Sequence, residues 1–253
     1  MKRSLATLLV LLALSSASTW AQSSEDTELL QALDDARFFD ETVTTLSIRI
    51  VSETPDEVRE ATLRLRFYDS EAGSFARIEF ETPEELAGQI FLSTPDATYF
   101  YGPDLDFPIK TSATAEVFGD AAVAQTSGIR FADSYTIEAR RDVTTEDGDL
   151  LWEIDLAAVD FTVAFQLVTV TVDPESLQPL SAILYAVSGI PFYEVFYEEY
   201  VTTEEGDTYV RSQRIVNQLL LGRVTTSAIL DLSSGENPPE LFDPVELGAG
   251  SPS

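Results

Sequence analysis

The sequence lacks cysteine and histidine altogether and has a single methionine. Without cysteine the chain cannot form a disulfide, so its hydrophobic core must hold the fold together. The absence of both residue types also excludes a Ser-His-Asp triad, a cysteine nucleophile and an ordinary zinc site. Paired carboxylates remain available as acid and base, but among 44 acidic residues the closeness of two carries little information. We therefore expect no enzymatic activity and no cofactor.

Positive charge is also scarce. The chain has 15 Lys and Arg residues against 44 Asp and Glu residues, which gives a formal net charge of −29 at pH 7. Such a polyanion repels nucleic acid and anionic membrane surfaces, so we expect no nucleic-acid partner. The acidic excess favours a solvated shell. The alternative, clustered calcium ligands, would need a D-x-D-x-D-G loop, which the sequence does not contain.

Long apolar runs are missing except near the start. Lys2 and Arg3 precede an apolar run from Leu5 to Leu14, which is too short to span a membrane. Thr19 and Ala21 then occupy the small-residue positions of a signal-peptide cleavage site. We predict cleavage after Ala21. Because no cysteine follows for lipid attachment, the mature chain is expected to be periplasmic or secreted.

What the sequence does have, from Thr42 onward, is alternation of apolar and polar residues, which indicates β-strands. In the segment 45–51, Leu46, Ile48 and Ile50 fall on one face. Turn sequences separate the segments, which favours antiparallel hairpins of roughly ten or eleven strands in all. The other alternating segments are 61–68, 75–80, 134–143, 150–157, 164–173, 180–187, 192–201, 207–220 and 223–230.

Helical signals are few. The segment 23–39 has an apolar stripe at helical spacing and acidic residues in its first turn, so it predicts an amphipathic helix. The segment 111–128 is rich in small residues and shows no strand alternation. It predicts one or two short helices that stop at Gly119 and Gly128.

A third helical signal is a T-x-x-E capping box that starts at Thr82. It predicts a short capped helix, ending at Gly88, that crosses the rim of the sheet with Leu86 pointing into the apolar interior. Gly88 would let the chain reverse without strain. The reversal is expected to place Ile90 and Leu92 on the concave face.

A sheet of this length must curl or close, because an open flat sheet leaves an apolar face uncovered. We therefore predict a mainly β (α+β) fold, in which a single curved antiparallel sheet forms an incomplete β-barrel covered by short helices. The expected divisions are a signal peptide (1–21), a half-barrel domain (22–234) and a flexible acidic tail rich in Pro and Gly (235–253).

Three stretches carry a resemblance to a known family. They are "FETPEELAGQIFLSTPDATYFYGPDL" (80–105), "VFGDAAVAQTSGIRFADSYTIEA" (117–139) and the hairpins of 187–230, where a Gly-x-Pro turn precedes an aromatic strand. In this order they resemble the outer-membrane lipoprotein-sorting (LolA-like) carriers over most of residues 25–232. The resemblance implies an incomplete β-barrel whose apolar concave face holds the acyl chains of lipoproteins or another lipid.

The same resemblance implies partners and a latch. Family carriers exchange cargo with a membrane transporter and an outer-membrane acceptor protein, and they use an arginine on an early strand to hold the lid. Early-strand arginines here are Arg49, Arg64, Arg66 and Arg77, and the motif does not single one out. This chain is also more acidic than the familiar carriers.

The residues expected to line a lipid cavity are apolar positions on predicted strands and the rim turn. Each of them is also an ordinary core or strand residue, so packed core and cavity wall both remain open. Alternative functions are an envelope lipid or peptide sensor of the same fold that regulates a partner protein, and a ligand-free structural β protein. The candidates are Ile48, Leu63, Leu65, Phe67, Ile78, Phe80, Leu86, Ile90, Leu92, Tyr99, Tyr101, Trp152 and Phe196.

Overall fold

The computed structural model describes residues 24–39, 42–204 and 206–247. The predicted signal peptide therefore lies outside the described residues. Within the described part, no helix has both the length and the apolar character needed to cross a membrane.

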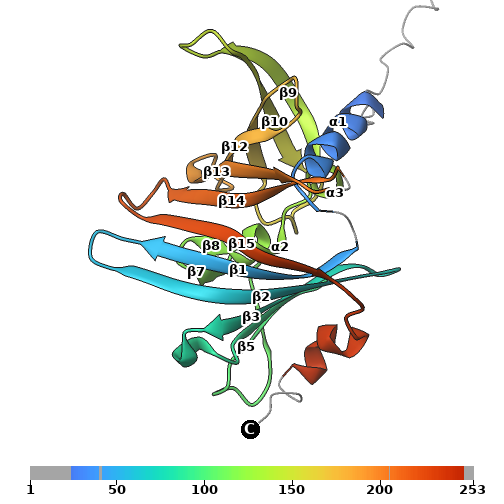
Figure 1. Ribbon diagram of the computed structural model, residues 1–253, viewed down its shortest axis with the longest axis vertical. Helices are drawn as coiled ribbons and strands as arrows, with labels where there is room; N and C mark the ends of the chain where they lie inside the picture. Colours follow the sequence, from blue (N-terminus) through green and yellow to red (C-terminus); the bar gives the residue numbers. More distant parts are fainter. Residues whose placement is uncertain (1–23, 40–41, 205, 248–253) are drawn as a thin grey trace, which may run out of the picture.

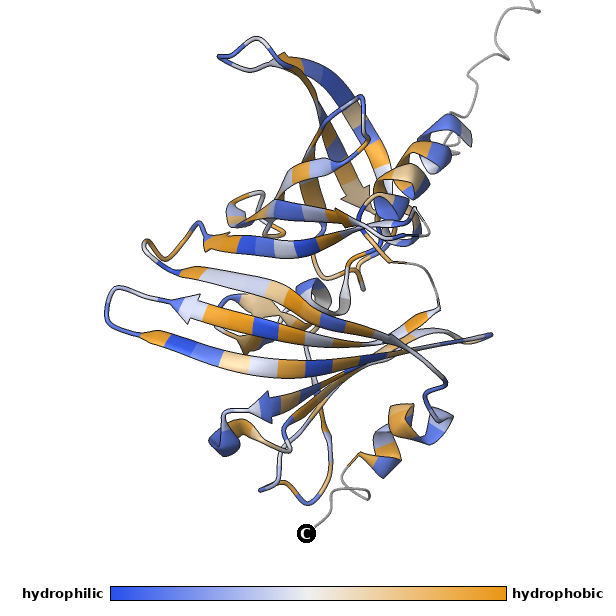
Figure 2. Cartoon of the chain, in the orientation of Figure 1, coloured by the Kyte–Doolittle hydropathy of each residue, from blue (hydrophilic) through white to orange (hydrophobic). Residues whose placement is uncertain are grey.

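One antiparallel sheet dominates the molecule and is curved but not closed (Figure 1). Its order places the first and last strands of the chain side by side, and apolar and polar residues alternate along the strands (Figure 2). The predicted fold class is confirmed. From one edge to the other the thirteen strands are β6 (Ile109–Thr111), β5 (Thr98–Tyr101), β4 (Ile90–Ser93), β3 (Gly73–Thr82), β2 (Val58–Ser70), β1 (Val43–Glu53), β15 (Val224–Ser234), β14 (Thr208–Asn217), β13 (Pro191–Thr202), β12 (Pro179–Tyr185), β11 (Leu167–Val172), β10 (Leu150–Ala158) and β9 (Tyr135–Thr144).

Short elements cover the concave face. They are helix α1 (Ser24–Asp35), the two-stranded hairpin of β7 (Glu116–Phe118) and β8 (Ala121–Ala122), and helices α2 (Val123–Ser127) and α3 (Phe131–Ser134). We call residues 24–39 and 116–134 the cover. The segment 111–128 was predicted to be helical, but its first part forms strands. Small residues there indicated helices, whereas Gly119 (φ +59°) serves as the turn of the hairpin.

The core lies between the cover and the concave face. Leu63 of β2 is paired with Phe80 of β3, and Leu65 with Ile78. These four side chains are buried. They belong to one apolar cluster that includes α1, the β7–β8 hairpin and α3.

The register of β4 corrects one prediction. Phe91 is paired with Ile78 on the concave side, whereas Ile90 and Leu92 are paired with Glu79 and Arg77 on the convex side. The three residues from 90 to 92 are all apolar, so alternation within β4 could not show which face each one occupies. Ile90 and Leu92 were thus assigned to the wrong face.

The convex side of β4 and β5 has its own apolar cluster, which the C-terminal segment covers. Two 3-10 turns, η2 (Pro239–Phe242) and η3 (Pro244–Glu246), bring Phe242 and Leu247 onto Ile90 and Leu92. Up to residue 247 the predicted flexible tail is therefore packed. Its composition indicated a loose segment, but its two apolar side chains Phe242 and Leu247 are buried against Ile90 and Leu92.

The capping box at Thr82 does not form. A single 3-10 turn, η1 (Glu84–Leu86), follows β3, and no side chain caps it. Thr82 remains in β3, where its hydroxyl accepts a hydrogen bond from the Thr62 amide at 3.0 Å. Leu86 is partly buried against the main core. Strand pairing satisfies Thr82, and this overrides the local helix signal.

Candidate functional site: a covered cavity on the concave face

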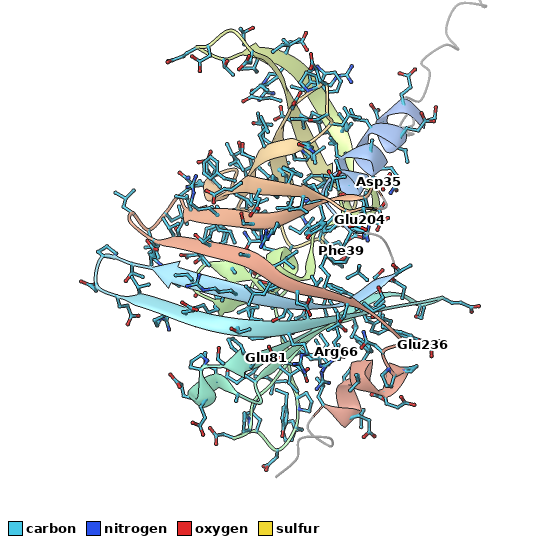
Figure 3. All side chains as sticks on the ribbon, in the orientation of Figure 1. Asp35, Phe39, Arg66, Glu81, Glu204 and Glu236 are labelled. Atoms are coloured by element: carbon cyan, nitrogen blue, oxygen red, sulfur yellow. The ribbon has the colours of Figure 1, made fainter. Side chains whose placement is uncertain are left out.

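A cavity of about 880 Å³ lies between the sheet and the cover. Its sheet wall includes Leu46 and Ile48 of β1 and Phe67 of β2. The cover contributes the segment after α1 and the segment from α2 to α3, and Phe39 lies near the centre of the molecule (Figure 3). The apolar cover side chains on the wall are Phe38, Phe39, Ile129 and Phe131.

A buried ion pair holds the cover together beside this cavity. Asp34, near the end of α1, accepts hydrogen bonds from the amides of Phe131 and Ala132 at 3.0 and 2.9 Å. Arg37 Nη2 donates to Asp34 Oδ1 at 2.5 Å and to the Ile129 carbonyl at 2.8 Å. Both side chains are buried. The pair therefore connects α1 to the start of α3.

Arg37 also connects the cover to the sheet. Its guanidinium donates to the Tyr197 hydroxyl of β13 at 3.3 Å and lies 3.9 Å from the centre of the Phe131 ring. Burial alone would lower the pKa of Arg37, but its neighbours Tyr197 and Asp34 raise that pKa above the ordinary value. The group stays charged, so the Asp34 pair persists.

The cavity wall includes the place where β14 and β15 separate. These strands pair only over 212–216 and 224–228, although both continue further. Beyond the paired part, the amide of Val210 donates to the Arg37 carbonyl at 2.9 Å, so the segment after α1 runs beside β14 instead. Side chains on both sides of this separation line the cavity, namely Arg211, Gln213, Ser227 and Ile229.

A second buried aspartate fixes the other part of the cover. Asp120, at the tip of the β7–β8 hairpin, accepts a hydrogen bond from Asn217 Nδ2 at 2.6 Å, and its amide donates to Thr225 Oγ1 at 2.9 Å. Arg223 Nε lies 3.3 Å from Asp120 Oδ2. A Cβ on the neighbouring Gly119 would lie 2.5 Å from Thr225 Oγ1. The hairpin tip is thus hydrogen-bonded to, and closely packed against, the adjoining ends of β14 and β15.

The predicted cavity residues separate into several groups. Only Ile48 and Phe67 line the cavity. Four others, Leu63, Leu65, Ile78 and Phe80, are packed core, and two, Leu86 and Trp152, are partly buried against it. The remaining five, Ile90, Leu92, Tyr99, Tyr101 and Phe196, lie on the convex face.

Phe196 shows why the face was mistaken. It is paired with Ser181 and Arg214, and the Arg214 guanidinium stacks over its ring at 4.2 Å. The next residue, Tyr197, lines the cavity. In the aromatic run 192–197 both faces carry aromatic rings, so alternation gave no indication of the inner one.

None of the four candidate latch arginines contacts the cover among the described residues, whereas Arg59, also on an early strand (β2), lies 5.3 Å from the centre of the Phe118 ring. The four lie on the convex face, where Arg49 pairs with Glu60, Arg64 with Glu81, and both Arg66 and Arg77 with Glu79. Arg37, just after α1, instead joins the cover to the sheet through its bonds to Ile129 and Tyr197. The i, i+3 spacing of Asp34, near the end of α1, and Arg37, two residues after the helix, was the signal in the sequence that pointed to this pair and that sequence reasoning missed.

The comparisons with known proteins agree with this architecture. The chain resembles a LolA superfamily protein from Nitrosomonas europaea, with a TM-score of 0.77 and 19% identity over 86% of this chain and 97% of that one. A domain provisionally described as an outer membrane lipoprotein-sorting protein, from Vibrio parahaemolyticus, has a TM-score of 0.71 and 16% identity over 86% and 96%. A DUF1329 family protein from Desulfovibrio piger has a TM-score of 0.69 and 14% identity over 87% and 96%.

These likenesses show the fold: the chain has a LolA-like fold, as the sequence resemblance predicts. Residues 75–248 match the family whose description reads "Uncharacterized protein", and the chain belongs to that family. A search of curated proteins returns no match.

Proposed function

We propose that this protein is an exported carrier that encloses the acyl chains of a lipoprotein or another lipid and transfers them towards the outer membrane. The observation that supports the proposal best is the covered cavity on the concave face. Its volume of about 880 Å³ falls within the range of about 300–1,000 Å³ that small-molecule sites occupy. A LolA-like fold adds support, because one structural neighbour is described as a lipoprotein-sorting domain.

The chemistry of the wall suits an acyl chain. Transfer of an acyl chain from water into an apolar site gains about 0.8 kcal/mol per methylene group. A wall built from side chains such as Ile48, Phe67 and Ile229 supplies that environment without a reactive group. Binding of this kind needs neither a cofactor nor a catalytic residue.

The cover provides a way in. On its α1 side, the cover is attached to the sheet by the bond from Arg37 to Tyr197 and the bond from Val210 to the Arg37 carbonyl, together with apolar contacts such as that of Phe39 with Phe67. On its hairpin side, Asp120 is enclosed by the sheet. Opening on the α1 side would widen the separation between β14 and β15 and expose the cavity.

The test uses two neighbouring residues on β15 that face opposite sides. Ser227 lines the cavity, whereas Ala228 is paired with Arg49 on the convex face. Ser227→Phe fills the cavity and is expected to weaken binding of a fluorescent fatty-acyl probe by about tenfold or more, equivalent to about 1.4 kcal/mol. Ala228→Phe adds the same ring outside and should leave the affinity within about twofold.

Both variants must keep the wild-type circular dichroism for the comparison to count. A third variant, Ile229→Phe, places the ring one step further along the same wall and serves if Ser227→Phe fails to fold. If the wild-type protein takes up no acyl probe, the carrier proposal fails and a ligand-free structural protein is the better interpretation. Equal loss of binding in the inner and outer variants would place the lipid elsewhere.

A further inference from the structure

Three neighbouring turns at one end of the sheet expose apolar side chains. Phe161 in the loop from β10 to β11 is 89% exposed, Val187 in the turn from β12 to β13 is 85% exposed, and Leu221 in the turn from β14 to β15 is 90% exposed. Leu219 and Leu220 beside it are also exposed. We call these five residues the apolar rim; the turn from β14 to β15 projects at the left in Figure 2.

The residues of the apolar rim come from turns that lie close together. Phe161 and Val187 line one shallow hollow of about 360 Å³. The turn that carries Leu221 begins beside the start of β13, where the Gln218 amide donates to the Phe192 carbonyl at 3.0 Å. Asn217 Oδ1 accepts hydrogen bonds from the amides of Leu219 and Leu220 at 2.9 and 2.8 Å, so the turn is held in shape.

The opposite ends of the same strands are acidic. Each turn there contains carboxylates, and Glu204 lies on the far side of the molecule from the turn between β14 and β15 (Figure 3). In contrast, two of the three rim turns, 186–190 and 218–223, contain no acidic residue. The loop of Phe161 contains Asp160, which accepts a hydrogen bond from the Thr162 amide, and the adjacent turn from β1 to β2 contains Asp56 and Glu57. The carboxylates at the opposite ends, in the turns from β9 to β10, β11 to β12 and β13 to β14, include Glu146, Asp147, Asp173, Glu175, Glu204 and Asp207.

The two turns without acidic residues give a strongly acidic chain a place at which it can approach a surface. A strand of twelve residues such as β13 is about 40 Å long, whereas the Debye length at physiological ionic strength is about 8 Å. A surface that touches the apolar rim is therefore screened from the carboxylates at the opposite ends of these strands, whereas Asp56, Glu57 and Asp160 lie closer to it. The rim presents separate side chains on turns, which a fluid lipid layer accommodates without a matching shape.

We propose that the apolar rim inserts into the surface of a lipid bilayer with uncharged or zwitterionic headgroups. Among the described residues of the two turns, the one cation is Arg223, and it faces Asp120. The rim therefore offers no ready partner for an anionic headgroup, and the chain's net charge of −29 opposes an anionic bilayer. The proposal does not rest on the carrier function.

Single cysteines test the insertion, because the native chain has none. The measurement uses the chain from Gln22, since residues 1–21 would bind lipid themselves and no described residue is lost. Leu221→Cys carries an environment-sensitive dye, and Val245→Cys is the matched control, because Val245 is also apolar and 83% exposed but lies in η3. With phosphatidylcholine vesicles, the dye at residue 221 should shift to the blue, whereas the dye at residue 245 should not.

Unlabelled variants measure the contribution of the rim. The double variant Phe161→Ser, Leu221→Ser should reduce vesicle affinity by about tenfold, and Val245→Ser should leave it within about twofold. Anionic lipid in the vesicles should weaken binding, and added salt should restore it. A dye at residue 221 that does not shift, or equal shifts at 221 and 245, would overturn the proposal. So would self-association of the free protein that Leu221→Ser abolishes, because the rim would then be an interface between two copies.

Discussion

Two buried aspartates attach the cover, and they differ in what they bind. Asp34 contacts mainly the cover itself, through Arg37 and the amides of Phe131 and Ala132. Asp120 contacts the sheet, through Asn217 and the neighbouring strand β15. The first ties two parts of the cover to each other, whereas the second ties the cover to the scaffold.

The two attachments indicate which side of the cover can move. The cavity lies beside Arg37. Its wall there includes the part of β14 and β15 in which the two strands no longer pair. Around Asp120 there is no comparable space, since even a Cβ on Gly119 would meet Thr225 and Ser52. We therefore expect the hairpin to act as a fixed hinge and the α1 side to open.

Loss of the scaffold anchor should have the largest effect. Asp120→Ala removes one partner of a buried charged cluster and leaves Asn217 Nδ2 without its acceptor, so the free energy of unfolding should fall by about 3–5 kcal/mol. Urea denaturation measures the change. Asp147→Ala, in an exposed turn, is the control and should change stability by no more than about 0.5 kcal/mol. A loss below about 1 kcal/mol for Asp120→Ala would mean that this cluster is not an anchor.

Loss of the Arg37 contacts should cost less and act locally. Arg37→Met keeps the length of the side chain but removes the ion pair with Asp34 and the bonds to Ile129 and Tyr197. The buried Asp34 carboxylate keeps its two amide donors, which limits the penalty of leaving it without a cation. We expect a loss of about 2 kcal/mol, together with faster hydrogen exchange at the amide of Phe131.

The rate at which a bound acyl probe dissociates separates the Arg37→Met variant from the Asp120→Ala variant. A bound acyl probe should dissociate faster from Arg37→Met than from Asp120→Ala, although the second variant is less stable. The same dissociation rate in both variants would contradict a cover that opens on the α1 side.

Alkaline pH should reveal a smaller difference between the two regions. Burial raises the pKa of Tyr193, which lies near Asp120, to about 12 from an ordinary 10. Below pH 10 both the folded and the unfolded chain keep this proton, so its contribution is constant. Above pH 10 the unfolded chain loses the proton first, and the free energy of unfolding falls as the pH rises towards 12.

Tyr193→Phe should make that decline shallower when denaturation is repeated from pH 9 to pH 12. Tyr99→Phe on the convex face is the control and should follow the wild type. Burial also raises the pKa values of Tyr135 and Tyr200 near Arg37, so part of the decline should remain in the Tyr193 variant. An unchanged slope would mean that Tyr193 does not contribute.

Salt should have the smallest effect, and it should act on both regions alike. At −29 the surface repels itself, and the Debye length decreases from about 10 Å at 0.1 M to about 3 Å at 1 M. The melting temperature should rise by a few degrees, about 2–4 °C per kcal/mol. The difference between the Asp120 and Arg37 variants should not change, because buried groups are screened little. A melting temperature that does not change between 0.1 M and 1 M salt would indicate that the surface carboxylates are compensated locally.

The sequence predicted the sheet well and the site only partly. Where polar residues separate apolar ones, as around Leu63 and Leu65, the inner face was evident. Where the run is apolar on both sides, as from Ile90 to Leu92, it was not. Pairing of β4 with β3 decides the face there, and pairing cannot be read from one strand alone.

The sequence by itself determined the mainly β architecture, the helix that carries Leu30 and Leu33, and the exclusion of histidine and cysteine chemistry. These follow from periodicity and composition, which are local properties of the chain. Only the folded chain shows that Arg37 joins the cover to the sheet, that Asp120 is buried, and that the C-terminal segment packs through Phe242. Each of these joins segments roughly 90 or more residues apart, such as Arg37 and Ile129, and a contact between distant segments depends on how the sheet curves in space.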